Sequence, residues 1–253
     1  MDVLILAGGD CTPELAQASG QNERALIEIG GQAMVVRVLR ALRGIREIGR
    51  IAVVGSNRVL DICGAIDSSI VRVASGDKMT QNFANGVKAL HGGHEILVST
   101  CDIPLVSTQT FASFLEKSRA RHLEIAYPIV TRQTCEAQFP DGKRTYAKLN
   151  SMEVTGGNCV LIPTRTAPNV VQLLETAYNA RKNPLALSKM LGANLMWKFA
   201  TKKLTVPDVE KQASRVLDGR VGAVEMADAT IAFDVDKLAD WQVAVQYLEN
   251  TRA

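Results

Sequence analysis

The sequence predicts an α/β fold with three layers, α/β/α, built around a mostly parallel sheet. The first observation behind this is an alternation of short, strand-like apolar segments with amphipathic segments of roughly 10–15 residues, which is typical of βαβ units. The second is that the first apolar segment, residues 3–7, stops abruptly at Gly8 and Gly9. Such a strand places bare backbone at the carboxyl edge of a sheet, where open α/β folds bind their ligands.

The alternation gives the elements of the first half in order. Strands are expected at 3–7, 51–54, 70–73 and 95–100, and helices at 32–45, 58–66, 79–90 and 107–120. The helix at 79–90 shows the helical period clearly, because Met79, Phe83, Val87 and Leu90 recur every three or four residues. Ser107 is a suitable N-cap for the helix that it opens.

The second half is expected to combine strands with a helical block. Strands are predicted at 123–130, 145–149, 158–162, 221–226 and 230–233, and a last helix follows with one apolar stripe. From about 170 to 217 the pattern is helical and is interrupted by Pro184 and Pro207. We interpret this block as a helical insertion in a single domain that spans residues 1–253.

Composition narrows the class of protein. The chain has 253 residues, 47% of them hydrophobic and 22% charged, with a net charge of +3, which is ordinary for a soluble globular protein. No basic run marks a nucleic-acid groove, and no apolar stretch approaches the ~20 residues of a membrane span. The five cysteines form no C-x-x-C pair, and the first residues already belong to a core strand, so a cytoplasmic protein with reduced thiols is expected.

The loop after the first strand indicates phosphate binding. Glycines let backbone amides approach phosphate oxygens without a Cβ in the way. Neither G-x-G-x-x-G nor G-x-x-x-x-G-K-[ST] is present, so the dinucleotide fingerprint and the Walker loop do not explain it. The loop therefore indicates a nucleotide site of another kind.

Two acidic segments are candidates for a metal site. Asp102 directly follows an apolar strand, and Pro104 ends that strand. An acid at this edge of the sheet either holds Mg²⁺, which prefers one or two carboxylates with phosphate oxygens and water, or caps a turn. Late in the chain, just after the last expected strand, alternation along a strand would put Asp234 and Asp236 on one face. One of the two would cap the last helix and the other would complete a metal site with Asp102, and the sequence does not choose between them.

The segment Gly156-Gly157-Asn158 has two interpretations. Two glycines between strands are usually a plain turn. They also suit a backbone wall for a substrate, and the basic residues upstream would then face an anionic acceptor. These residues are Lys143, Arg144 and Lys148.

The order of these motifs resembles a known family. L-A-G-G is followed by N-E-R-A-L-I-E-I-G-G, C-D-I-P-L, T-G-G-N and F-D-V-D. This is similar to the nucleotidyltransferases of the nucleotide-diphospho-sugar transferase fold, which is Rossmann-like. The group that it resembles most contains the molybdenum-cofactor guanylyltransferases and cytidylyltransferases.

The resemblance implies a nucleotide site and a cofactor. The glycine loop would wrap the nucleoside triphosphate, with the backbone amides of Ala7, Gly8 and Gly9 on the phosphates. Mg²⁺ would bind Asp102, and Asp236 is the best match for the second acid. The full set of implied nucleotide-binding residues is Leu6, Ala7, Gly8, Gly9, Asn82 and Gly86.

The activity implied is transfer of a nucleoside monophosphate from an NTP to a small phosphorylated or hydroxyl acceptor, with release of pyrophosphate. Arg24 would neutralise the pyrophosphate, and Lys148 or Arg144 would orient the acceptor against Gly156, Gly157 and Asn158. The partners are then the nucleotide and the acceptor, without nucleic acid or membrane. The helical block is where acceptor selection or association into a homodimer is expected.

The chain departs from the family pattern at three positions. The family loop runs L-A-G-G-x-G-T-R, whereas Cys11 and Pro13 replace its third glycine and its arginine here. A non-glycine residue at positive φ is disfavoured, and Pro13 also lacks an N–H. Arg24 stands where the family has lysine, which keeps the charge and changes the geometry.

Two alternatives remain at this stage. The first, favoured by Cys11 and Pro13, is a non-catalytic nucleotide-binding or regulatory module of the same fold. The second is a Rossmann-type dehydrogenase, which would require a third glycine in the first loop and an acid after the second strand. That strand is instead followed by Gly55 and Ser56.

Overall fold

The computed structural model describes residues 1–90, 92–150, 152–171, 173 and 192–252. Its centre is a nine-stranded sheet in the order β5-β4-β1-β6-β10-β7-β9-β8, with β11 paired to β7. The strands of its first half are β1 (Asp2–Leu6), β4 (Ile51–Gly55), β5 (Val71–Ala74) and β6 (Glu95–Thr100). Those of its second half are β7 (Ile125–Thr131), β8 (Ala147–Leu149), β9 (Met152–Gly156), β10 (Cys159–Pro163) and β11 (Val221–Glu225).

The first four strands are parallel to one another, as the alternating pattern predicts. β10 then enters antiparallel between β6 and β7, and β8 and β9 continue the sheet as an antiparallel pair. β11 returns parallel to β7. The sheet is therefore mixed, with its parallel half around β1.

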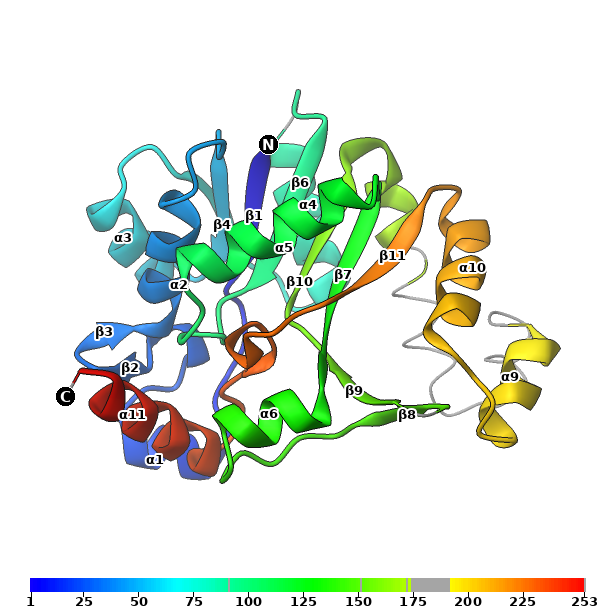
Figure 1. Cartoon of the computed structure of the whole chain (residues 1–253). Helices are drawn as coiled ribbons and strands as arrows, with labels where there is room; N and C mark the ends of the chain where they lie inside the picture. Colours follow the sequence, from blue (N-terminus) through cyan, green and yellow to red (C-terminus); the bar gives the residue numbers. More distant parts are fainter. Residues whose placement is uncertain (91, 151, 172, 174–191, 253) are drawn as a thin grey trace.

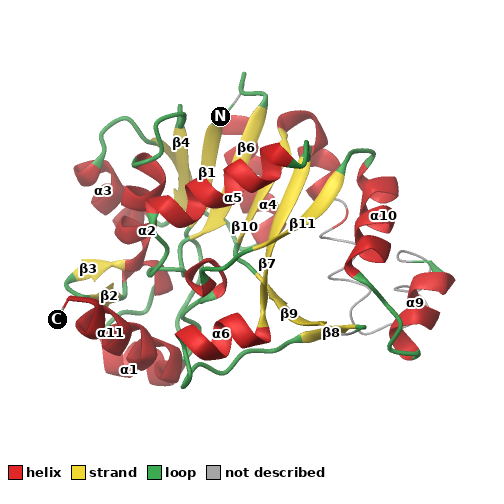
Figure 2. Ribbon diagram, in the orientation of Figure 1, coloured by secondary structure: helices red, strands yellow, loops and turns green. Residues whose placement is uncertain are grey.

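Helices cover both faces of the sheet and complete three layers (Figures 1 and 2). One face packs against α2 (Met34–Arg43), α3 (Asn57–Ile66) and α5 (Thr108–Ala120), and the other against α4 (Met79–Ala89). β1 is buried on both sides: Val3 and Ile5 point into the first core, and Leu4 points into the second beside Phe83. This burial explains why β1 is an unbroken apolar run. The predicted α/β/α fold is confirmed.

The carboxyl ends of the parallel strands face the edge where the C-terminal helix lies, whereas the N-terminus lies at the opposite edge of the sheet (Figure 1). Four elements gather there beyond β1: α1 (Pro13–Ser19), the 3-10 helix η1 (Arg24–Leu26), and the short pair β2 (Glu28–Ile29) and β3 (Gln32–Ala33). The last helix, α11 (Leu238–Arg252), packs against α1 and β2. The indole N–H of Trp241 donates to the carbonyl of Glu28 at 3.0 Å, which ties α11 to this edge.

Several expected elements differ from the structure. The strand expected at 230–233 is wrong, because Ala229–Ala232 form the 3-10 helix η3, in which the Asp228 side chain accepts from the Thr230 amide at 3.0 Å. The sequence interpretation missed α1, α6 (Arg132–Gln138) and β9. Only Cys135 of α6 is buried, so the helix carries almost no apolar stripe.

The helical block is partly outside the described residues. Two helices lie in its described part, α9 (Ala193–Ala200) and α10 (Val206–Leu217). Pro207 does not interrupt a helix: it lies in the first turn of α10, which Thr205 caps through a capping box with Asp208. Residues 172 and 174–191, including Pro184, lie outside the described residues.

None of the helices in the described part of the chain combines the length and the apolar character that crossing a bilayer requires.

Candidate active site

The loop after β1 leaves two backbone amides free at the edge of the sheet. Gly9 accepts the backbone N–H of Arg24 at 3.0 Å, and Cys11 donates to Asn22 at 2.8 Å, so a second segment pins the loop. Within the described residues, no hydrogen bond engages the amides of Gly8 and Gly9, and both residues are exposed. These two amides are therefore available to an anion.

The backbone groups of Leu6, the last residue of β1, and of Ala7 are bonded to neighbouring segments, which bears on the implied phosphate site. The amide of Ala7 donates to Val54 at 2.8 Å, and the carbonyl of Leu6 accepts from Cys101 at 3.1 Å. The Ala7 amide is thus not available to phosphate in this conformation.

The unusual residues of the loop fit its backbone without strain. Cys11 is not at positive φ, so the conflict expected from replacing a glycine there is absent. Pro13 opens α1, where its missing N–H costs nothing, and Thr12 caps that helix. Cys11 and Pro13 are therefore compatible with the backbone of this loop.

Asn82 forms the side of the loop. Its Oδ1 accepts from the Gly76 amide at 2.6 Å and its Nδ2 donates to the Gly76 carbonyl at 3.0 Å. These bonds hold residues 75–76 against Gly8, where a Cβ would lie 3.2 Å from that of Ser75. Gly86 lies deeper, because a Cβ there would come within 2.3 Å of Leu4. Asn82 thus supports the loop, and Gly86 allows α4 to pack closely on β1.

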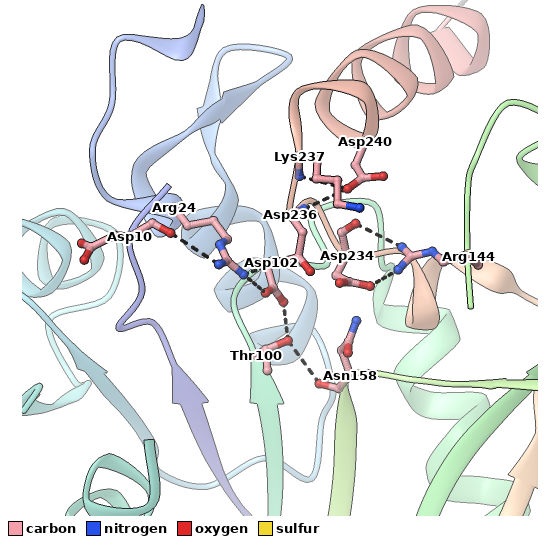
Figure 3. Close-up of polar contacts among 10 residues, drawn as sticks. All are labelled: Asp10, Arg24, Thr100, Asp102, Arg144, Asn158, Asp234, Asp236, Lys237 and Asp240. Atoms are coloured by element: carbon pink, nitrogen blue, oxygen red, sulfur yellow. Dashed lines mark hydrogen bonds and ion pairs between the residues drawn. The ribbon is translucent and has the colours of Figure 1, made fainter. Parts of the chain in front are cut away.

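Asp102 and Asp236 meet at the guanidinium of Arg24 (Figure 3). Asp102 follows β6, its Oδ2 lies 3.1 Å from Arg24 Nη1, and its side chain is only 15% exposed. Asp236, which precedes α11 and is 46% exposed, forms an ion pair with the same nitrogen. Thr100 Oγ1 donates to Asp102 Oδ1 at 2.5 Å. One cationic group therefore joins two carboxylates that are far apart in the sequence.

Arg144 binds the neighbouring carboxylate, Asp234. Nη1 of Arg144 forms an ion pair with the Asp234 carboxylate, and Nη2 donates to the Asp234 carbonyl at 3.1 Å. The guanidinium also lies 4.8 Å from the centre of the Phe233 ring. The two late acids, which sequence could not separate, thus have different partners: Asp236 contacts Arg24, and Asp234 contacts Arg144.

The pKa values follow from this arrangement. Burial, with a contribution from the charge of Asp234, raises the pKa of Asp102 despite its bonds to Thr100 and Arg24. Burial and then Asp234 raise the pKa of Asp236 to about 6. Burial acts in the same direction on Asp234, but the charge and hydrogen bond of Arg144 outweigh it and lower the pKa. The Asp102–Asp236 pair therefore has more negative charge than Arg24 balances.

Gly156 and Gly157 lie between the end of β9 and the start of β10, where a Cβ at either position would come close to a side chain of β7. Gly156 is the last residue of β9, and a Cβ there would lie 2.2 Å from the Tyr127 hydroxyl oxygen. A Cβ on Gly157 would lie 2.7 Å from Pro128. The next residue, Asn158, points its buried side-chain amide toward Asp234 (Figure 3), and this contact helps to lower the pKa of the Asp234 carboxyl. The Asn158 side chain therefore faces the same carboxylate as Arg144.

The structure does not bring every candidate together. Arg24, Asp102, Arg144, Asn158 and Asp236 lie around one point in Figure 3. Lys148 is exposed on β8, paired across the strands with Glu153. Sequence reasoning missed Thr100 and Tyr127. Thr100 lies two residues before Asp102, and its polar side chain at the end of an apolar strand was a usable signal.

Within the described residues, no three His, Cys, Asp or Glu side chains form a ready-made metal site. Two carboxylates converge instead, and Mg²⁺ prefers such a donor set with phosphate oxygens and water. Asp102 and Asp236 thus fit a cation that arrives with a phosphate ligand.

A family model described as the MobA-like NTP transferase domain matches residues 3–189. The chain belongs to this family. It is an NTP-dependent nucleotidyltransferase with a Rossmann-like fold, as the resemblance implies. No curated protein shows a significant sequence match, and the dehydrogenase alternative has no support in these comparisons.

Solved structures agree with this assignment. A hypothetical transferase from Thermus thermophilus is 28% identical with a TM-score of 0.80, covering 95% of this chain and 98% of that one. A CMP:2-keto-3-deoxy-manno-octonic acid synthetase complexed with CTP is 12% identical, with a TM-score of 0.63 and coverage of 99% and 98%. The 2-C-methyl-D-erythritol 4-phosphate cytidylyltransferase of Thermus thermophilus is 19% identical, with a TM-score of 0.56 and coverage of 98% for both. The last two show the fold alone.

Proposed function

We propose that this protein transfers a nucleoside monophosphate from an NTP to a small phosphorylated or hydroxyl acceptor and releases pyrophosphate, with Mg²⁺ as cofactor. The observation that carries the proposal is the convergence at one edge of the sheet. The free amides of Gly8 and Gly9, the guanidinium of Arg24 and the carboxylates of Asp102 and Asp236 lie together there.

Each group has a role in such a transfer, which depends mainly on positioning and charge neutralisation. The amides of Gly8 and Gly9 bind phosphate oxygens, and Arg24 balances the negative charge that develops on the departing pyrophosphate. Asp102 and Asp236 would hold the cation. When bound, Mg²⁺ supplies charge neutralisation at the reacting phosphate and aligns the attacking oxygen.

The acceptor side is formed by the ends of β9 and β10. The Asn158 side-chain amide faces Asp234, and Tyr127 covers Gly156. Arg144 is committed to Asp234, so it orients the acceptor only indirectly in this conformation. Asn158 is therefore the residue of this set that we expect to contact the acceptor.

A thermal-shift panel with the four nucleoside triphosphates, each with and without Mg²⁺, tests the donor site. A ligand at ~100 times its dissociation constant adds about 2.7 kcal/mol, or roughly 5–10 °C for a chain of this size. We expect such a rise for one base, dependent on Mg²⁺ and lost in Asp102→Asn. The absence of a shift with every triphosphate would reject the proposal.

Turnover separates the transferase from the non-catalytic binder. The nucleotide that gives the shift is incubated with a protein-free small-molecule fraction from cells, and pyrophosphate is measured. Release that requires the fraction and is lost in Asp102→Asn supports transfer. Binding without release under these conditions favours the regulatory module instead.

A further inference from the structure

Arg24 links three segments of the site that are far apart in the sequence. Its Nη1 contacts Asp102 and Asp236, and its Nη2 donates to the carbonyl of Asp10 at 3.4 Å. Its own backbone N–H donates to Gly9. The side chain therefore extends from the phosphate loop to the carboxylates (Figure 3).

Within the described residues, Arg24 is the one cationic side chain bonded to Asp102 and Asp236. The remaining guanidinium of the cluster, that of Arg144, is occupied by Asp234. Two carboxylates thus share a single positive charge, whereas a divalent cation would balance both.

The guanidinium is only partly satisfied in this position. Nε of Arg24 is buried and has no hydrogen bond to a described residue, and the contact from Nη2 to Asp10 is near the upper limit of hydrogen-bond length. Since an arginine at a permanent ion pair usually uses its planar fork on one partner, this position is held mainly by charge. A stronger cation could therefore replace it at modest cost.

A bound phosphate would give Arg24 a second anionic partner. The free amides of Gly8 and Gly9 lie on the loop to which the Arg24 backbone is bonded. Phosphates bound at these amides would therefore attract the guanidinium of a residue that is already tied to the same loop.

We propose that Arg24 is an exchangeable counter-cation of the metal site. In the nucleotide-free protein it holds Asp102 and Asp236 and competes with free divalent cations for them. When a cation arrives together with a triphosphate, the cation takes the two carboxylates and Arg24 moves to the phosphates. The inference rests on the proposed function and adds that metal and nucleotide bind as a coupled pair.

The exchange predicts that binding of the metal and binding of the nucleotide are positively coupled, and that this coupling depends on Arg24. Nucleotide phosphates would remove the competitor from the carboxylates, so each ligand would raise the affinity for the other, by the same factor. Without the guanidinium, the carboxylates would bind free cations directly, and bound phosphates would raise the affinity for the cation by a smaller factor.

The test is a titration of the protein with Mn²⁺, in which electron paramagnetic resonance measures the bound metal. The titration is done first with Mn²⁺ alone and then in the presence of inorganic tripolyphosphate, which serves as a base-free probe. Arg24→Gln should bind free Mn²⁺ at least about tenfold more tightly than the wild type, within the range of measured couplings. Arg24→Lys retains the charge and should stay within about threefold of the wild type. Arg58→Gln is the matched control, because Arg58 is an exposed arginine of the same region that pairs with Glu23.

The remaining outcomes separate the exchange from the proposed function. Equal Mn²⁺ affinities in wild type and Arg24→Gln, with tripolyphosphate still raising both, would overturn the exchange and leave the transferase intact. Loss of the tight binding in Arg24→Gln/Asp102→Asn would assign it to the carboxylate pair and support the exchange. Absence of Mn²⁺ binding in every form, with tripolyphosphate as well, would reject the metal site on which both proposals depend.

A second measurement covers the case in which Arg24→Gln does not fold. In the wild type, the ¹⁵N signal of the Arg24 side chain, assigned by its absence in Arg24→Lys, is followed by NMR. It should move on addition of Mg²⁺ with tripolyphosphate and change little with Mg²⁺ alone. An unchanged signal with both ligands bound would overturn the exchange.

Discussion

The backbone N–H of Val235 donates to the carbonyl oxygen of Asp102 at 2.8 Å. This bond anchors the segment before α11 to the residue that follows β6, and it places Asp236 next to Asp102 although 134 positions separate them in the sequence. The backbone bond therefore sets the positions of the two carboxylates, and the Arg24 side chain bridges them. Substitutions of the side chains should accordingly change charge and binding more than they change the fold.

Asp102→Asn should abolish the Mg²⁺-dependent binding of nucleotide without a large cost in the free energy of unfolding. The pKa of Asp102 is raised, mainly by burial, so its ionised form is disfavoured in the folded protein. Asparagine keeps an acceptor for Thr100 and removes the charge, although it loses the ion pair with Arg24. We expect the free energy of unfolding of the ligand-free variant to stay within about 1 kcal/mol of the wild type, measured by urea denaturation. A loss of several kcal/mol would mean that the ion pair is primarily structural.

Asp236 should give stability a specific pH dependence. Its pKa is raised from 3.8 to about 6, so the folded protein holds this proton more tightly than the unfolded chain does. The resulting stabilisation is complete below about pH 3.8 and is lost as the pH rises through about 6. Because the side chain is 46% exposed, screening reduces the loss to the order of 1 kcal/mol.

The variant Asp236→Asn isolates this effect because it cannot ionise. Relative to the wild type, its free energy of unfolding should rise between about pH 4 and about pH 7. Urea unfolding at several pH values within this range measures the difference. Above that range the difference should be constant. A difference that does not vary with pH would show that Asp236 keeps its ordinary pKa.

The sequence predicts the parts of the site that depend on local pattern. The strand β1, its two glycines and the acid after β6 are each visible in a short segment, because burial on both sides leaves an apolar run that ends at a polar loop. α1 was missed because its seven residues have one buried side chain, Leu15, and its signals are the cap Thr12 and the following Pro13.

The partners of the late acids could not be predicted, for a physical reason. The choice between Asp234 and Asp236 depends on Arg24 and Arg144, which lie far away in the chain and are close to these acids only in the folded structure. Likewise, the alternation expected for a strand does not apply, since 233–237 is neither strand nor helix. Glycine at 156 is explained by the ring of Tyr127, a contact between strands that no local pattern carries.

Gly9→Ala should weaken nucleotide binding and leave stability unchanged. A Cβ at Gly9 meets nothing within 4 Å, and its φ is not in the left-handed region, so we expect a change in unfolding free energy below about 0.5 kcal/mol. The added methyl group would occupy the space through which phosphate approaches the amide. A thermal shift with Mg²⁺ and nucleotide equal to that of the wild type would place the phosphates elsewhere.

Gly86→Ala should have the opposite effect, a loss of stability without a direct effect on the phosphate-binding loop. The new Cβ would lie 2.3 Å from Leu4 Cδ1, in a core where Leu4 is fully buried and has no room to move. Overpacking of this kind costs about 1–3 kcal/mol, and the higher helix propensity of alanine returns about 1 kcal/mol, so a net loss of about 0–2 kcal/mol is expected. Urea unfolding measures it. A clear gain in stability would contradict the close packing of α4 on β1.

Arg144 and Lys148 were equivalent candidates in the sequence, and their substitution should now give different results. The Arg144 side chain is 14% exposed and that of Asp234 is 21% exposed, so Arg144→Gln leaves a half-buried carboxylate without its partner. We expect a loss of about 2–3 kcal/mol in the free energy of unfolding. Lys148→Gln, on an exposed strand, should stay within about 0.5 kcal/mol of the wild type.

The double variant Arg144→Gln/Asp234→Asn decides how Arg144 acts. If the cost of Arg144→Gln comes from the unpaired charge of Asp234, removing that charge should recover part of the stability, and the two substitutions should be non-additive in urea unfolding. Nucleotide-dependent thermal shifts, measured in parallel, should recover together with stability, because Arg144 would reach the metal site only through the segment that carries Asp234 and Asp236. Additive costs would instead show that Arg144 contributes independently of Asp234, which would restore direct contact with the acceptor as its role.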